Sequence, residues 1–216
     1  MLFSGRTMSY LANPQGRTAQ TFLGTTSLAV DQKKFGTYSL DVPDAVNARF
    51  TTVGHNDTNF TLEAWVRFSK FNSSGYVTIW DHYGGTSALG IYSNNIVTYQ
   101  SSSGNIDFNL GVTLGTGLFH HIALTRSGDT IKLFINGTQR GGDQTLGGSF
   151  LPSGAQLRLR GSNLGNTYAS HMDEVRLSKT VRYTGSFSVP TAPFTNDANT
   201  VLLCHFEQSP LVDDNS

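Results

Sequence analysis

Apolar and polar residues alternate at every second position in many short segments of this chain, and this alternation limits the folds open to it. The clearest example spans residues 60–68, where Phe60 and Val66 belong to one set of positions and Glu63 and Trp65 to the other. Successive side chains of a β-strand point to opposite faces, so the pattern predicts a strand. Both sets contain bulky side chains, which indicates a central strand covered on both faces. No helical periodicity is sustained over about ten residues.

A further pair of strands is predicted over residues 120–126 and 130–135. They are joined by Ser127-Gly128-Asp129, a composition typical of tight turns. More strand-like runs occupy residues 76–81, 88–93, 96–100, 105–110, 156–160, 171–177 and 200–206. Short strands at this spacing, separated by Gly, Ser and Asn, predict an all-β fold, a two-sheet antiparallel β-sandwich. The 23 glycines are then explained as turn residues.

The charge balance excludes several classes of partner. The chain carries 15 basic and 15 acidic side chains, and only 14% of its residues are charged, whereas soluble proteins average about 25%. Without a basic cluster there is no long-range attraction for phosphate or anionic lipid, so we expect no nucleic-acid binding and no membrane binding. No run approaches the roughly 20 apolar residues of a membrane helix. Few charges also mean weak self-repulsion, which favours a protein packed against neighbours.

The sequence divides into three parts. Residues 1–26 lack clear alternation and are predicted to be either a strand plus loops that complete the sandwich or an arm that docks on another subunit. Residues 27–207 are the predicted sandwich domain, and residues 208–216 are a polar C-terminal tail. Cys204 is the only cysteine, which excludes an intrachain disulfide. The N-terminus includes Arg6 and no long apolar run, so we expect no signal peptide.

Five segments with recognisable patterns follow one another along the chain. They are residues 34–40 (KFGTYSL), 59–66 (NFTLEAWV), 119–126 (FHHIALTR), 133–137 (LFING) and 172–178 (MDEVRLS). Together they resemble the laminin-G-like, concanavalin A-like jelly-roll family, over roughly residues 27–207. The resemblance implies a concanavalin A-like jelly roll and says little about the ligand, because one fold serves many functions.

The C-terminal region carries a narrower pattern. Residues 176–179 (RLSK) are followed by residues 181–184 (VRYT), and residues 202–207 read LLCHFE. This resembles a variant of the family found in structural proteins of bacteriophages and giant viruses, in tail fibres, baseplates or capsid decorations. The resemblance implies a virion protein that is made in a host cytoplasm, assembles with other virion proteins, forms a homo-oligomer and contacts host-surface glycans.

Carboxylates decide whether this fold could cleave polysaccharides, because a glycosidase needs two of them flanking the scissile bond. Asp173-Glu174 is the only close acidic pair on a predicted strand, and adjacent strand residues face opposite sides. Glu63 has no acidic residue two positions away. For the same geometric reason, His120 and His121 cannot chelate one ion together. With no Gly-x-Ser-x-Gly motif either, we expect no catalytic residue and no enzyme activity.

No cofactor is expected, although calcium stays open as an alternative. Laminin-G-like domains often hold one calcium ion at a rim loop through Asp side chains and backbone carbonyls. The candidate ligands are Asp57, Asp81 and Asp107. None of them lies in the dense acidic loop of a dedicated calcium site.

Three tyrosines are candidates for stacking against a sugar ring. Tyr83 lies in a Gly-rich loop, and Tyr92 and Tyr99 lie on predicted strands with the prospect of exposed faces. The alternative is that they pack across strands or against a neighbouring subunit.

Asp173, Arg126 and Trp65 are assigned structural roles. Asp173 is predicted to share an inward face with Val175 and Leu177, and an inward carboxylate must be hydrogen-bonded or paired. We expect it to accept hydrogen bonds from the backbone of a loop or to meet Arg126. Loss of the carboxylate should then lower thermal stability sharply.

These observations lead to three hypotheses about function. The first is a non-enzymatic virion structural protein, a capsid decoration or a tail-fibre or baseplate component, that displays a lectin-like domain for assembly and attachment. The second is a stand-alone glycan-binding adhesion module. The third is a polysaccharide-cleaving enzyme, which the arrangement of carboxylates disfavours.

Overall fold

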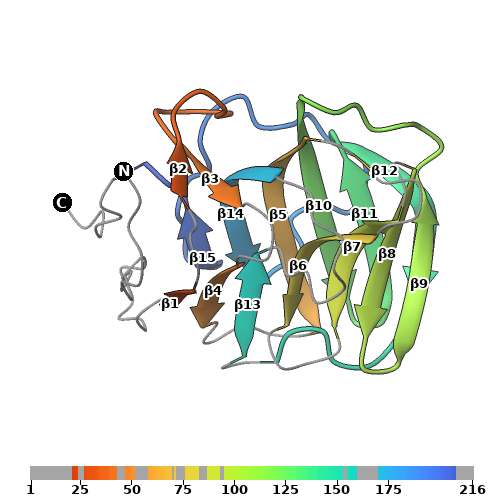
Figure 1. Cartoon of the computed structure of the whole chain (residues 1–216). Helices are drawn as coiled ribbons and strands as arrows, with labels where there is room; N and C mark the ends of the chain where they lie inside the picture. Colours follow the sequence, from red (N-terminus) through yellow and green to blue (C-terminus); the bar gives the residue numbers. More distant parts are fainter. Residues whose placement is uncertain are drawn as a thin grey trace.

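The computed structural model describes residues 21–23, 27–42, 47–51, 58–69, 71, 76–82, 87–92, 95–152, 155–159 and 170–207. In these residues every regular element is a β-strand, and the strands form two antiparallel sheets that pack face to face (Figure 1). The predicted all-β, two-sheet antiparallel sandwich is therefore confirmed.

Among the described residues, each sheet has seven strands in a continuous order of pairing, and one further strand joins the second sheet, sheet B. Across sheet A the order is β1 (Thr21–Leu23), β4 (Asn47–Thr51), β13 (Gln156–Leu159), β6 (Tyr76–His82), β7 (Ala88–Tyr92), β8 (Ile96–Ser101) and β9 (Gly104–Asn109). Across sheet B it is β12 (Thr138–Thr145), β11 (Thr130–Ile135), β10 (Phe119–Ser127), β5 (Asn59–Phe68), β14 (Ser170–Ser178), β3 (Ser39–Val42) and β2 (Ser27–Ala29). The further strand, β15 (Thr200–Cys204), pairs with β14.

β5 is a central strand covered on both faces, as its alternation predicted. It pairs with β10 on one side and with β14 on the other. Its apolar positions, such as Phe60 and Val66, are buried between the sheets, and Glu63 and Trp65 on the outer face are buried as well. The second face must therefore be covered by chain outside the two sheets.

Several strands escaped the sequence reasoning, among them β3, β4 and β12. β12 reads TQRGGDQT and contains no large apolar residue, because it is an edge strand whose side chains are mostly exposed. Edge strands bury little apolar surface, so they leave little hydrophobic pattern to detect.

β14 changes partner halfway along its length. Its first part pairs with β3 and its last part with β15. Between them the register against β5 shifts and Glu174 has a φ of 53°, which makes a β-bulge. Asp173 pairs with Trp65 on the outer face of sheet B. The prediction that Asp173 shares an inward face with Val175 and Leu177 is wrong, because the extra residue of the bulge reverses the alternation.

Part of the N-terminal segment 1–26 takes part in the sandwich. β1 pairs with β4 at one edge of sheet A, through Phe22 opposite Ala48. Residues 1–20 and the C-terminal tail 208–216 lie outside the described residues. No helix in the described part of the chain is long and apolar enough to cross a membrane.

Candidate functional site

A long connection covers the outer face of sheet B. We call residues 179–199, which join β14 to β15, the strap. Tyr183, Phe187 and Phe194 of the strap surround His121 of β10 edge-to-face, with ring centroids 6.4, 5.7 and 5.9 Å away. Tyr183 and Phe187 stack on each other at 3.6 Å. The strap and the outer face of sheet B thus enclose a second, aromatic core.

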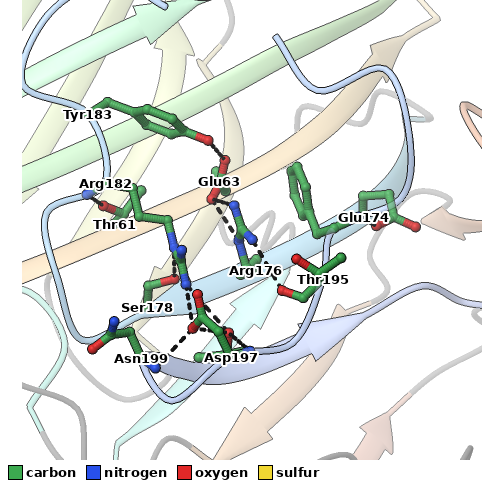
Figure 2. A network of polar contacts seen from close by, with 12 residues as sticks. Thr61, Glu63, Glu174, Arg176, Ser178, Arg182, Tyr183, Thr195, Asp197 and Asn199 are labelled. Carbon is green, nitrogen blue, oxygen red and sulfur yellow. Dashed lines mark hydrogen bonds and ion pairs between the residues drawn. The ribbon is translucent and has the colours of Figure 1, made fainter.

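Glu63 lies in this second core, and Figure 2 shows it with two of its partners, Arg176 and Tyr183. Arg176 of β14 donates hydrogen bonds to Glu63 Oε1 from Nε at 2.8 Å and from Nη2 at 2.6 Å. The Tyr183 hydroxyl donates to Oε2 at 2.8 Å, and His121 Nε2 lies 3.1 Å from the same oxygen. The Arg176 guanidinium also lies 4.3 Å from the centre of the Phe194 ring.

The electrostatics of the cluster favour an ionised Glu63. Burial would raise the pKa of Glu63, but the hydrogen bond with His121 and the charge of Arg176 outweigh it, so the pKa lies below its usual value. Burial, followed by the charge of Glu63, raises the pKa of Tyr183. Glu63 and His121 are completely buried. Because no substrate can reach these groups, we assign the cluster to holding the strap on the sheet.

Arg182 ties the beginning of the strap to its end (Figure 2). Its guanidinium donates to the Ser178 hydroxyl at 2.6 Å and to Asp197 Oδ1 at 2.8 Å. The hydrogen bond from Arg182 lowers the pKa of Asp197. The backbone N–H of Arg182 donates to Thr61 Oγ1 of β5 at 2.8 Å. Both ends of the strap are therefore fastened to sheet B.

Gly137→Ala is expected to loosen the middle of the strap. The Phe187 N–H donates to the Gly137 carbonyl at 2.8 Å, and a Cβ on Gly137 would overlap the Phe187 carbonyl oxygen. Gly137 also has a φ of 77°. We expect a loss of about 2–3 kcal/mol of unfolding free energy. Urea denaturation measures the loss, and limited proteolysis should show faster cleavage within the strap.

Gly128→Ala is the matched control for this variant. Gly128 has a φ of 59°, but no atom lies within 4 Å of the point that an added methyl group would occupy. It reports the cost of the left-handed backbone alone, about 1–2 kcal/mol. Equal losses in the two variants, with no change in strap cleavage, would contradict the importance of the Gly137 contact.

Asp173 fastens the loop that leads into β3. Its Oδ2 atom accepts hydrogen bonds from the backbone N–H groups of Lys34 at 2.8 Å and Phe35 at 3.1 Å. Burial raises the pKa of Asp173 to about 7, although these two hydrogen bonds oppose the rise. Arg126 lies elsewhere: its Nε donates to the Gly128 carbonyl at 2.8 Å. Asp173 is fully buried and does not face a substrate.

Glu174, the bulge residue, fastens the end of the strap. It accepts a hydrogen bond from the Phe194 N–H at 2.6 Å and lies 2.8 Å from His205 Nδ1. The hydrogen bond with Glu174 raises the pKa of His205. Both carboxylates of the Asp173-Glu174 pair thus bind segments outside the strands of sheet B: Asp173 binds the loop at residues 34–35, and Glu174 binds the strap. The expectation that they face opposite sides is wrong because of the bulge, and both are buried.

The outer face of sheet A carries a second ion pair. Arg158 of β13 donates from Nε to Asp81 Oδ1 of β6 at 2.6 Å and from Nη2 to Oδ2. Burial raises the pKa of Asp81, and the hydrogen bonds and charge of Arg158 limit the rise. Further along this face, the Thr98 hydroxyl donates to Asp107 Oδ1 at 2.6 Å. Asp107 and Gln100 are exposed, so this face presents polar groups to solvent.

The predictions for the three candidate tyrosines differ in how they compare with the structure. Tyr99 is completely buried and stacks on Phe150 at 5.1 Å. Its predicted role in stacking against a sugar is wrong, because it pairs with Leu89 on the inner face of sheet A. Tyr92 ends β7, where it pairs with Tyr76 and Ile96, and its role stays a prediction. Tyr83 lies outside the described residues.

The calcium candidates are not brought together. Asp81 lies within β6 rather than in a rim loop, and both of its oxygens face Arg158. Asp107 lies on β9, three strands away in sheet A, a separation of about 14 Å. Asp57 lies outside the described residues. In the described part of the chain, no group of three or more His, Cys, Asp or Glu could hold a metal ion.

Sequence reasoning missed the partners of the buried acids. In the sequence, Arg176 was noted only as part of a family pattern, and His121 was considered only as a metal ligand. A signal was nevertheless present: Glu63 occupies the second face of a strand predicted to be covered, and a buried carboxylate needs a partner. Which cationic residue becomes this partner depends on the order of the strands in the sheet, and the sequence pattern does not reveal that order.

Comparison with known proteins identifies the family. A family model described as the concanavalin A-like lectin/glucanases superfamily matches residues 36–186, from the loop before β3 to the middle of the strap. The chain belongs to this superfamily. The resemblance of the five sequence segments is thereby confirmed. A comparison with curated proteins found no match.

Solved structures share the fold of this superfamily member at low sequence identity. "Cellulose induced protein, Cip1" has a TM-score of 0.57 and 20% identity, covering 72% of this chain and 86% of that one. Domain 4 of AbnA, an arabinanase from Geobacillus stearothermophilus in complex with arabinotriose, has a TM-score of 0.50 and 14% identity, covering 82% of both chains. The binding domain of botulinum neurotoxin DC in complex with SialylT has a TM-score of 0.57 and 14% identity, covering 76% of this chain. This chain spans 44% of that binding domain.

Proposed function

We propose that this chain is a non-catalytic, carbohydrate-binding domain of the lectin type. One observation carries the proposal: in the described residues, the carboxylates on the strands are occupied by partners. Glu63 is held by Arg176, and Asp81 by Arg158. A glycosidase needs instead two carboxyl groups about 5–10 Å apart across an open substrate site. Two structures of the same fold, solved in complex with arabinotriose and with SialylT, add support.

We place the carbohydrate contact on the outer face of sheet A. The strap covers Glu63 and His121 on the outer face of sheet B, and Figure 1 shows sheet A as the nearer of the two layers. Thr98, Gln100 and Asp107 offer donors beside acceptors on this face, and Gln100 and Asp107 are exposed. Sugar hydroxyls require both kinds of partner in fixed positions.

We further propose that the domain works on a virus particle, as a capsid decoration or a tail-fibre or baseplate component. The viral pattern in residues 176–184 and 202–207 supports this placement, and so does the low charge content of the chain. Antibody labelling of purified particles tests it. The placement would be overturned if the antibody does not label the particles and if particles without the protein keep their infectivity. Neither result would affect the proposal of carbohydrate binding.

A glycan array tests carbohydrate binding by sheet A. The wild-type chain should bind a subset of glycans, and Gln100→Ala and Asp107→Ala should weaken binding about tenfold, equivalent to 1.4 kcal/mol. Thr138→Ala, at an exposed position of sheet B, is the control and should bind like wild type. Reducing-end release from the bound polysaccharide should be absent. Binding to no glycan, or equal loss in the control, would contradict the proposal.

A further inference from the structure

A groove lies beside the strap on the outer face of sheet B. Its floor consists of two cross-strand pairs from β10 and β11, Thr125 with Lys132 and Ser127 with Thr130. Asp143 of β12 forms one wall, and Val181 and Thr184 of the strap form the other. The groove has a volume of about 350 Å³. This lies at the lower end of the range of small-molecule sites.

Lys132 bridges the two walls. Its ammonium group lies 3.0 Å from Asp143 Oδ1 and donates to the Thr184 carbonyl at 3.1 Å. The lysine and the aspartate neutralise each other, so the groove carries no net charge from its own lining. A simple ion could be bound by charge only if it broke the ion pair between Lys132 and Asp143.

The remaining lining offers hydroxyl and methyl groups. Within the described residues, no hydrogen bond engages the side-chain hydroxyls of Thr125, Ser127, Thr130 or Thr184. Each hydroxyl can donate one hydrogen bond and accept others. The threonine methyl groups and Val181 supply apolar contact between them. Hydroxyl groups set among a mostly apolar surface without net charge suit a sugar, which carries both hydroxyl and C–H groups, better than an ion.

We propose that this groove binds one neutral monosaccharide unit of a glycan, at a site separate from the outer face of sheet A. The hydroxyls of the floor and of Thr184 exchange hydrogen bonds with sugar hydroxyls, and the Lys132–Asp143 pair supplies a fixed donor and acceptor at one end. The groove has no aromatic residue in its described lining, so no ring-stacking contact contributes. The affinity for a single sugar is accordingly weak, with a Kd of about 1 mM or above.

The test uses the full ¹⁵N-labelled chain and NMR titration with the methyl glycosides of glucose, galactose, mannose and N-acetylglucosamine. At least one glycoside should give saturable shifts at the backbone amides of Ser127, Thr130 and Thr184. Thr130→Val keeps the side-chain shape but removes a hydroxyl, and it should weaken binding about fivefold or more. Thr98→Val makes the same change on the outer face of sheet A and should leave the groove titration unchanged. If Thr130→Val alters the melting temperature, Ser127→Ala, at the exposed end of β10, serves as a second groove variant.

The outcomes separate this site from the one proposed on sheet A. Groove shifts that weaken in Thr130→Val but not in Thr98→Val support the groove, whether or not the glycan array places binding on sheet A. Shifts confined to sheet A residues, and sensitive only to Thr98→Val, overturn the groove while supporting the proposed function. Saturable shifts with none of the four glycosides also overturn the groove.

Discussion

Arg176→Met is expected to destabilise the chain by about 3–5 kcal/mol, enough to unfold many domains. The substitution leaves Glu63 fully buried without the two hydrogen bonds that Arg176 donates and without the charge that balances it. Removing one partner of a buried ion pair costs far more than the pair contributes, because a charge stays behind in a poorly solvated place. The strap should loosen at the same time, since Arg176 also packs against Phe194.

A double variant separates the charge from the shape. In Glu63→Gln/Arg176→Met, residue 63 is neutral and can still hydrogen-bond with His121 and Tyr183. We expect this variant to recover at least half of the stability lost in Arg176→Met. Urea denaturation at pH 7 measures both. If the single variant loses less than about 1 kcal/mol, or the double variant is as unstable as the single one, the buried charge is not the cause.

Only Asp173→Ala, and not Asp173→Asn, is expected to lower stability at pH 8. Asparagine keeps an oxygen that can accept the hydrogen bonds from Lys34 and Phe35, and it removes a charge that is costly to bury. Alanine leaves two N–H groups without their acceptor and opens a small cavity. We expect Asp173→Ala to lose about 2–4 kcal/mol. Asp173→Asn should equal or exceed the wild type.

The pH dependence gives a sharper test, because burial raises the pKa of Asp173 from 3.8 to about 7. Between these values the folded chain keeps a proton that the unfolded chain has released. The contribution of Asp173 to stability is therefore full below about pH 4 and is lost as the pH rises to about 7. Asp173→Asn does not titrate, so its stability relative to wild type should rise across this range. Parallel melting curves of the two proteins between pH 4 and pH 8 would contradict the raised pKa.

Strands with a clear local pattern were predictable from the sequence. In β10 and β11, Ile122, Leu124, Leu133 and their neighbours alternate with polar residues and flank a short turn, and the structure pairs them as neighbours in sheet B. Such a hairpin depends on contacts between residues close in sequence. β12 was missed because an exposed edge strand has no apolar set to reveal it.

The candidate site was much less predictable, because its contacts join distant parts of the chain. Glu63 and Arg176 are separated by 113 positions, and their meeting depends on β14 pairing beside β5. Tyr99 was a candidate for an exposed face, but the packing of one sheet on the other places it in the core.

Hydrophobic periodicity was therefore sufficient for the strands and the sandwich, since both follow from which side chains avoid water. The pairing of the buried charges, the covering of sheet B by the strap and the reversal of β14 at Glu174 required the assembled fold. Each of these depends on which strands become neighbours, and one bulged residue is enough to move every later side chain to the other face.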